Sequence, residues 1–371
     1  MGIRVLIAGG GTSGHINPAI AIADRIRAED PQSEIEFCGT QRGMESDIVP
    51  RSGYVIHPIR ARGVPSRPSV KMAKAFMDFA AGRKSCISLI RDFAPDVVIG
   101  TGGYVCTPLV SAAYHEKIPV LLHEQNAFPG RSNRLMSRRA DVVCTSFAGM
   151  EACFPKAKSV IFTGNPVKKI FFETTRAAAR KELDIPDDTV FLLAMGGSLG
   201  ARTINQSVTA LSEMMAGTKT RIILSAGKQQ FAELNESLTV TNNKLEVREY
   251  IYNPQTYMAA ADLIICRAGA ITCAEVAALG VPSVMIPYPF AAGDHQTCNA
   301  RAFEKAGAAI LMKDSEVCAR TLYDAVIPVI LDKARLLKMG ECAKSLAKPL
   351  ADRDIAEQIF RLSAEKNKTN I

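Results

Sequence analysis

Residues 4–23 read RVLIAGGGTSGHINPAIAIA, and this stretch decides the fold of the first half of the chain. The mostly apolar residues 4–8 predict a short buried strand, and a glycine-rich turn follows them directly. After the turn, apolar residues recur at helical spacing from Ala19 to Ile26, in a helix that we expect to begin near Pro18. Strand, glycine turn and helix in this order predict the start of a doubly wound α/β domain.

The alternation of strand and helix continues along the whole chain. After Gly164-Asn165-Pro166 the pattern starts again, so two successive βαβ series predict two doubly wound domains. We expect an N-terminal domain at 1–163, a C-terminal domain at 164–345, and a closing helix within 346–371 that returns to the first domain. The further strands are expected at 96–100, 120–124, 141–144, 190–195, 221–227, 245–251, 262–266 and 282–287.

Length and composition favour a globular protein without a membrane span. The chain has 371 residues, which is too many for one compact core. No apolar run reaches the roughly 18 residues that cross a bilayer, and the first residues lack a signal-peptide core, so we expect a cytoplasmic protein. The ten cysteines form no CxxC pair and the five histidines are scattered, so we expect buried thiols and no metal site.

The net charge of +8 is concentrated in one segment. Residues 51–91 carry nine basic side chains and a single acid, Asp78, which predicts a surface that attracts anions. Apolar residues at helical spacing in this segment predict a basic amphipathic helix that lies on an anionic membrane; the alternative is that the apolar strip faces its own sheet. The candidate membrane residues are Lys71, Met72, Lys74, Phe76, Phe79, Arg83 and Lys84.

Glycine turns follow strands in both halves of the chain. The first, at 9–14, has the G-x-G-x-x-G spacing of a dinucleotide site. An NAD-dependent dehydrogenase would also need an acid at the end of the second strand, but that strand ends in Gly39-Thr40, which weakens this alternative. Similar turns at 100–103, 196–200 and 267–270 favour a ligand held in a cleft between two domains.

Two polar features mark the second half. Glu275 is expected in about the first turn of the helix after Gly269, where a carboxylate can accept hydrogen bonds from ribose hydroxyls; a favourable position in the helix dipole explains it as well. The segment 294–299 places Asp294, His295, Gln296 and Asn299 after a strand end, where doubly wound folds bind ligands. A polar surface loop is an equally good explanation of that segment.

Seven segments, in this order, resemble the motifs of the bacterial MurG family of N-acetylglucosaminyltransferases. This resemblance implies a GT-B fold with two Rossmann-like domains facing a central cleft. It also implies transfer of N-acetylglucosamine from UDP-GlcNAc to lipid I with inversion, which forms lipid II in peptidoglycan synthesis and links the protein to cell shape and division. The segments are GGGTSGHINPAIAIA (9–23), GTGGYVCTP (100–108), HEQNAFPGRSNR (123–134), TGNPV (163–167), GGSLGARTIN (196–205), CRAGAITCAEVAALGVPSVMIP (266–287) and DHQTCNA (294–300).

The resemblance also implies which residues bind the donor and the acceptor. Two positions depart from the usual family pattern: Ser13 stands where a glycine is common, and Lys168 where an arginine is common. The implied donor residues are Thr12, Ser13, Gly14, Asn126, Lys168, Ser198, Ile251, Ala270, Ile271, Thr272, Glu275, His295 and Gln296. The acceptor-side candidates are Gly102, Gly103, Tyr104 and Glu124.

His15 is the candidate catalytic residue, because a neutral imidazole beside the first glycine turn can take the proton of an attacking hydroxyl. The alternative is a histidine that only hydrogen-bonds a loop carbonyl. No cofactor and no metal are expected. A UDP-GlcNAc 2-epimerase-like enzyme and a non-catalytic nucleotide-sugar binding protein remain alternative functions.

The implied partners are UDP-GlcNAc, lipid I and the anionic inner membrane surface, with other cell-wall synthesis proteins as further candidates and no nucleic acid. The implied location is peripheral, on the cytoplasmic face of the inner membrane.

Overall fold

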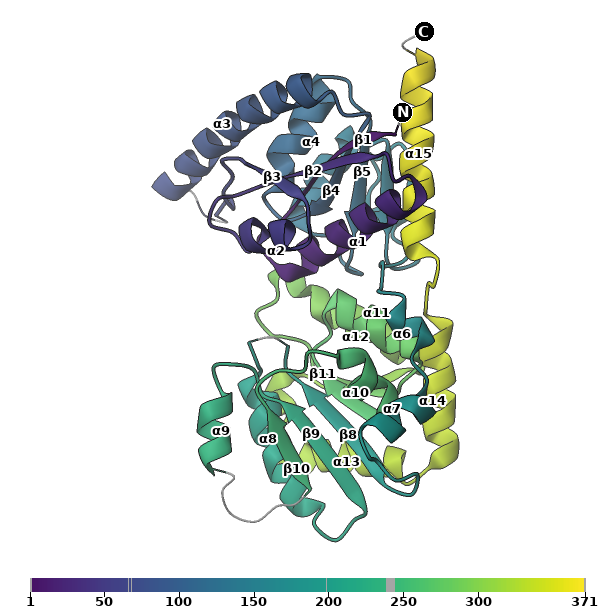
Figure 1. The fold of residues 1–371 in the computed structure, drawn as a ribbon. Helices are drawn as coiled ribbons and strands as arrows, with labels where there is room; N and C mark the ends of the chain where they lie inside the picture. The colour runs from purple at the N-terminus through teal and green to yellow at the C-terminus, as the bar shows by residue number, and fades with distance from the viewer. Residues whose placement is uncertain (1, 66, 68, 198, 238–243, 370–371) are drawn as a thin grey trace. The chain divides into compact units, whose positions relative to one another are not determined.

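The computed structural model describes residues 2–65, 67, 69–197, 199–237 and 244–369, which fold into two compact units (Figure 1). The first unit comprises residues 1–167 and 350–371, and the second comprises 168–349. The chain therefore leaves the first unit, builds the second, and returns to complete the first.

The sheet of the first unit is parallel throughout its described strands. Their order is β3-β2-β1-β4-β5-β6-β7, so the chain reverses its direction of growth between β1 and β4. Both faces of β1 are buried, which explains the continuous apolar run at its start. The strands are β1 (Arg4–Gly9), β2 (Glu34–Gly39), β3 (Val55–Pro58), β4 (Val97–Gly102), β5 (Val120–Glu124), β6 (Val142–Thr145) and β7 (Val160–Phe162).

Helices cover both faces of this sheet. α3 and α4 bury their apolar sides against Leu6 and Val98, whereas α1 and the last helix, α15, pack on Val5 and Ile99 on the other face. Figure 1 shows α15 beside α1, far from it in sequence. The helices are α1 (Ser13–Glu29), α2 (Glu45–Arg51), α3 (Val70–Phe93), α4 (Cys106–His115), α5 (Arg131–Met136), η1 (Ser137–Arg139), η2 (Glu151–Cys153) and α15 (Ala351–Thr369).

The second unit repeats this architecture with a sheet of order β10-β9-β8-β11-β12-β13, also parallel in its described part. α8 and α13 bury one face of it. The strands are β8 (Val190–Met195), β9 (Thr220–Ser225), β10 (Leu245–Arg248), β11 (Leu263–Cys266), β12 (Ser283–Met285) and β13 (Ala309–Leu311). The helices are α6 (Ile170–Glu173), α7 (Arg176–Glu182), α8 (Arg202–Met214), α9 (Phe231–Ser237), α10 (Pro254–Ala260), α11 (Ala270–Leu279), η3 (Ala292–Asp294), α12 (His295–Lys305), η4 (Asp314–Glu316), α13 (Ala319–Ile330) and α14 (Lys333–Ser345).

The predicted class of two doubly wound α/β units is confirmed. The predicted start of α1 near Pro18 is wrong, because the amides of His15 and Ile16 already bond to the Thr12 carbonyl oxygen, at 3.1 and 3.3 Å. Pro18 lies in the second turn, where its ring removes the one hydrogen bond that residue 18 would donate. Within the described residues, no helix combines the length and apolarity needed to cross a membrane.

Candidate active site

Two glycine loops meet in the first unit, at the point where the strand order reverses. One follows β1 and the other follows β4, and ligands of doubly wound folds bind at such points. Gly102 and Gly103 have φ values of 109° and 76°, which favour glycine. A Cβ on Gly103 would lie 2.2 Å from the Gly10 carbonyl oxygen, so only glycine allows the two loops to approach this closely.

His15 lies between these loops with one ring nitrogen held. Its Nδ1 is 3.1 Å from the Thr101 carbonyl oxygen and 3.0 Å from Gln125 Oε1. Both neighbours are acceptors, so Nδ1 carries the proton and Nε2 keeps its lone pair. No hydrogen bond joins Nε2 to any residue that the structure describes. The imidazole is thus fixed in the tautomer that a base acting through Nε2 requires.

Gln125 connects His15 to a second, buried histidine. Its Nε2 donates to the Thr101 carbonyl oxygen at 2.8 Å and contacts His123 Nδ1 at 3.0 Å. His123 Nε2 in turn lies 3.1 Å from the Gly164 carbonyl oxygen, to which it donates. Burial lowers the pKa of His123 to about 4, so this ring stays neutral. Gln125 could not be selected from the sequence, because 110 positions separate it from His15.

Glu124, an acceptor-side candidate, is buried and uses its carboxylate inside the protein. One oxygen accepts from the Asn126 amide at 3.0 Å; the other accepts from the Gly130 amide at 3.0 Å and from Asn133 Nδ2 at 2.9 Å. The Asn126 side chain also donates to Glu124, at 3.3 Å. Glu124 therefore shapes the loop after β5, which carries Gln125.

Glu45 performs a similar task beneath the first glycine loop. This fully buried carboxylate accepts from the Gly11 amide at 3.1 Å and from the amide and hydroxyl of Thr40 at 3.0 and 2.6 Å. Burial raises its pKa, but these hydrogen bonds outweigh burial and leave the pKa below its ordinary value. A Cβ on Gly10 would lie within 3 Å of the carboxylate, so the loop is packed against it. The sequence carries no signal for this contact.

The remaining candidates of the first unit lie around the same loops. Thr12 is the N-cap residue of α1 through its backbone carbonyl oxygen, Ser13 and Gly14 begin the helix, and Tyr104 follows the second loop with its ring against Gly11. The first unit therefore brings together His15, Thr12, Ser13, Gly14, Gly102, Gly103 and Tyr104 at the β1/β4 edge, with Glu124 and Asn126 at the end of the adjacent strand β5.

In the second unit, Glu275 lies one turn later in its helix than the sequence predicts. α11 begins at Ala270, so Glu275 is its sixth residue, and the first turn contains no acid. A favourable helix-dipole position therefore does not explain this carboxylate. Burial raises its pKa to about 7, although Lys168 acts in the opposite direction. A carboxylate held in a position that disfavours its charge is a feature of functional sites.

The other donor candidates line the same carboxyl edge of the second sheet. Ile251 is buried after β10, while Ala270, Ile271 and Thr272 form the first turn of α11 after β11. Asn299 is buried and donates to the Ala268 carbonyl oxygen at 3.0 Å, which ties α12 to the turn before α11.

His295 and Gln296 begin α12, after β12. Gln296 Oε1 accepts from the Tyr288 amide at 2.9 Å, and His295 Nδ1 lies 2.8 Å from the Ala292 carbonyl oxygen. Ser198 lies outside the described residues. Among the residues that are described, no group of three His, Cys, Asp or Glu side chains could hold a metal ion.

Comparison with known proteins identifies the family. The glycosyltransferase family 28 N-terminal domain matches residues 5–145, and the corresponding C-terminal domain matches residues 191–359. The UDP-N-acetylglucosamine–N-acetylmuramyl-(pentapeptide) pyrophosphoryl-undecaprenol N-acetylglucosamine transferase of Acetivibrio thermocellus is 40% identical over 366 residues, which cover 98% of this chain and 99% of that protein. The chain belongs to the MurG family.

Solved structures agree with this assignment. The crystal structure of MurG from Acinetobacter baumannii is 30% identical, with a TM-score of 0.81 over 97% of this chain and 99% of that one. A UDP-GlcNAc 2-epimerase from Neisseria meningitidis shares the fold alone, at 15% identity and a TM-score of 0.64 over 97% and 100% of the two chains. Membership of the MurG family makes the chain a glycosyltransferase of the GT-B fold.

The second half of the basic segment 51–91 lies in α3 in this MurG family member, with five of the nine basic side chains. Its buried face consists of Ala75, Gly82, Cys86, Ile90 and Phe93, so the apolar strip predicted from the sequence is only partly turned inward. Phe76 is 59% exposed and Met77, which the sequence reading did not select, is 71% exposed. Lys71, Lys74 and Lys84 are also exposed, whereas Met72, Phe79 and Arg83 are half-buried.

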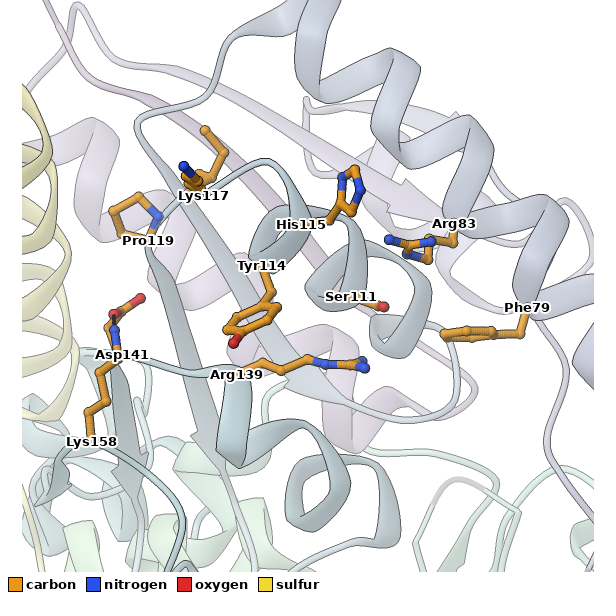
Figure 2. Close-up of a pocket in the computed structure, with 11 residues that line it drawn as sticks. Phe79, Arg83, Ser111, Tyr114, His115, Lys117, Pro119, Arg139, Asp141 and Lys158 are labelled. Atoms are coloured by element: carbon orange, nitrogen blue, oxygen red, sulfur yellow. Dashed lines mark hydrogen bonds and ion pairs between the residues drawn. The ribbon is translucent and has the colours of Figure 1, made fainter. Parts of the chain in front are cut away.

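Phe79 and Arg83 face a cavity of about 900 Å³ between α3, α4 and η1 (Figure 2). In Figure 2, Arg83 and Arg139 approach the same space from different elements. The pKa of Arg139 is lowered, mainly because the side chain is buried. Repulsion from the neighbouring charges of Arg138 and Arg83 lowers it further. Asp141 is the one acid among the described lining residues, and it pairs with Lys158 at 2.5 Å.

Proposed function

We propose that this chain transfers N-acetylglucosamine from UDP-GlcNAc to the lipid-linked acceptor named for its relatives, N-acetylmuramyl-(pentapeptide) pyrophosphoryl-undecaprenol, with inversion at the anomeric carbon. The observation that carries the proposal is His15, whose Nδ1 is bound to two carbonyl oxygens while Nε2 keeps its lone pair. A sugar-nucleotide sensor has no proton to remove and does not require this arrangement, whereas an epimerase would use a base on the donor sugar itself and needs no acceptor.

In the proposed reaction, His15 acts as general base. The acceptor hydroxyl oxygen attacks the anomeric carbon, and its proton passes to His15 Nε2. The bond between the anomeric carbon and the β-phosphate oxygen breaks, and UDP leaves with the electron pair. The hydrogen bonds from Nδ1 to Thr101 and Gln125 stabilise the imidazolium that forms.

The donor is proposed to bind the carboxyl edge of the second sheet. The first-turn amides of α11, at Ala270, Ile271 and Thr272, point along the helix axis and suit a pyrophosphate, which becomes more negative as the bond breaks. Glu275, in the second turn, would accept from the ribose hydroxyls. The proposed contacts to the sugar and the uracil come from His295, Gln296 and Ile251, and Ser198 and Lys168 are the further phosphate candidates.

The test is a transfer assay with UDP-GlcNAc labelled in the sugar. With lipid I present, we expect label in an extractable lipid product and release of one UDP per transfer. Without lipid I, we expect neither product nor conversion of the donor. Conversion to another nucleotide sugar without acceptor would instead establish the epimerase, and binding without any reaction would establish the sensor.

We further propose that α3 holds the enzyme on an anionic membrane surface at the cytoplasmic face. The exposed Phe76 and Met77 suit the interfacial region, and each basic side chain near an anionic surface contributes about 1 kcal/mol. The arginines of the adjoining cavity suit the phosphate of a lipid headgroup. An acceptor anchored in the same membrane would then be within reach.

The membrane proposal is tested by flotation with vesicles of anionic and of neutral lipids. Replacing Lys71, Lys74, Arg83 and Lys84 with Gln should abolish the binding to anionic vesicles and leave UDP affinity unchanged. The matched control replaces four exposed cations of the second unit, Lys181, Lys333, Arg335 and Lys338, with the same loss of charge. Equal loss in both variants would mean that net charge, and not α3, drives the binding.

A further inference from the structure

A second cavity of the first unit, of about 730 Å³, lies beside the candidate active site at the carboxyl ends of β2 and β3. Its walls are the segment 40–43 after β2, the segment 58–63 at the end of β3, and one side of α3. The Ile59 amide bonds to the Gly39 carbonyl oxygen at 2.8 Å, which fixes the two segments relative to each other. The cavity is therefore a built feature of the sheet edge.

The charge in this cavity is positive and largely uncompensated. Arg42, Arg60 and Arg62 line it, and Asp78 is the one acid among its described lining residues. Arg62 binds Asp78, with Nε 2.9 Å from the carboxylate. Arg42 and Arg60 form no ion pair with any residue in the described part of the chain. Two arginines facing one cavity without a carboxylate partner attract an anion.

Tyr104 joins this cavity to the loops around His15. Its side chain lines the cavity, and its ring lies 3.3 Å from the position of a Cβ on Gly11. The residue before it, Gly103, contacts the His15 ring closely enough that a Cβ would lie 3.4 Å from Cδ2. A molecule that reaches His15 Nε2 across Tyr104 can therefore place another of its groups in the cavity.

α3 forms the opposite wall. A Cβ on Gly82 would lie 2.0 Å from the Arg60 carbonyl oxygen, so this helix packs directly on the segment that carries Arg60. Asp78 and Ser85 of α3 also line the cavity. The cavity thus lies between the glycine loops and the helix proposed to contact the membrane.

The first glycine loop itself is a poor site for the anion of an acceptor. Its Gly11 amide already donates to Glu45, and an anion placed there would face the charge of that buried carboxylate. An acceptor anion near His15 therefore requires cations from another part of the edge, and Arg42 and Arg60 supply them.

We propose that this cavity is the subsite for an anionic group of the acceptor, whose phosphate or carboxylate oxygens bind Arg42 and Arg60 while the attacking hydroxyl lies at His15. The inference rests on the proposed transferase function. The named acceptor of the relatives carries both chemistries, a pyrophosphate and a peptide. The position next to α3 places the subsite on the lipid side of the reacting sugar.

The test is steady-state kinetics of Arg42→Gln, Arg60→Gln and the double variant, in the full-length chain. The double variant loses the hydrogen bonds from both arginines to the acceptor anion, which should raise the acceptor KM about 10- to 100-fold. The KM for UDP-GlcNAc should stay within about twofold, because none of the donor candidates lines this cavity. The control is Arg353→Gln, an exposed arginine of α15.

Acceptor analogues separate the two sources of the anion. If the subsite binds the pyrophosphate, replacing Arg42 and Arg60 should no longer raise the acceptor KM when the acceptor is an analogue with a single phosphate. If the subsite binds a peptide carboxylate, the two substitutions should no longer raise the acceptor KM when the acceptor lacks the peptide. An acceptor KM within about twofold of the parent in the double variant, with the parent active, overturns the subsite. Absence of transfer by the parent would instead overturn the proposed function.

Discussion

Replacing Glu275 with Gln should make the second unit more stable and the enzyme a weaker binder of UDP. Burial raises the pKa of this carboxyl from 4.5 to about 7 in the folded chain, so the folded protein holds the proton more tightly than the unfolded chain does. The stability is then highest below pH 4.5 and falls as pH rises through 7. Above pH 7 the buried charge destabilises the native state.

The size of this effect follows from the shift. About 2.5 pKa units correspond to about 3 kcal/mol, and since the side chain is partly exposed, about 2 kcal/mol is the better expectation. Glutamine has the same shape without the charge. At about 2–4 °C per kcal/mol for a domain of this size, the variant should melt about 4–8 °C higher than the parent at pH 8 and nearly together with it at pH 5.

The same carboxylate makes donor binding depend on pH. If the ionised form accepts the ribose hydroxyls, UDP should bind the parent about tenfold more weakly at pH 6 than at pH 8, because most of the free protein is then protonated. Glu275→Gln should bind UDP about 30-fold more weakly at pH 8, the effect of losing about 2 kcal/mol of charged hydrogen bonding, and its affinity should change little with pH.

Calorimetric titration with UDP and thermal unfolding without ligand, each at pH 5, 6 and 8, measure both effects. Glu304→Gln, at an exposed position of α12 in the same unit, is the matched control and should change neither property. A Glu275→Gln variant that melts with the parent at pH 8 and binds UDP equally well would refute both the cost of this charge and its contact with the ligand.

Three further outcomes follow from the first unit. His15→Ala should lower kcat about 10²–10⁴-fold with little change in UDP affinity, and near-parental turnover would assign the proton to another group. Glu45→Gln should lower kcat about tenfold, because the amides of Gly11 and Thr40 lose a charged acceptor and the loop before His15 loosens; steady-state kinetics with unchanged kcat would contradict this. Ile359→Ala, a fully buried side chain of α15, should destabilise the first unit by about 2–5 kcal/mol in denaturant titration while UDP affinity changes less than threefold.

The central strands and the helical faces could be predicted from the sequence, because strands such as β4 and β11 are buried on both sides and read as continuous apolar runs. The short strands β3 and β7 were missed, because they have only four and three residues and none of these residues is buried. β13, with three residues, gave no usable pattern either.

The site shows a similar division between local and distant information. The position of His15 after a glycine turn is a local pattern, so it could be proposed from the sequence. The proton position on its ring depends on Gln125 and Thr101, which topology brings from distant strands. Glu45 was missed for the same reason: two of its three hydrogen-bond donors are backbone amides, which leave no trace in the pattern of side chains.

The return of α15 to the first unit has a consequence for synthesis on the ribosome. Ile355, Ala356, Ile359 and Leu362 fill part of the first core, yet they are translated after the entire second unit. At usual elongation rates, roughly 10–40 s pass between Val167 and these residues. During that interval the nascent first unit exposes the apolar surface of α1 and its sheet. The second unit ends at Pro349, so its last residues are translated only roughly 0.3–3 s before those of α15. The unit that begins the chain therefore cannot complete its core before the second unit has been translated in full.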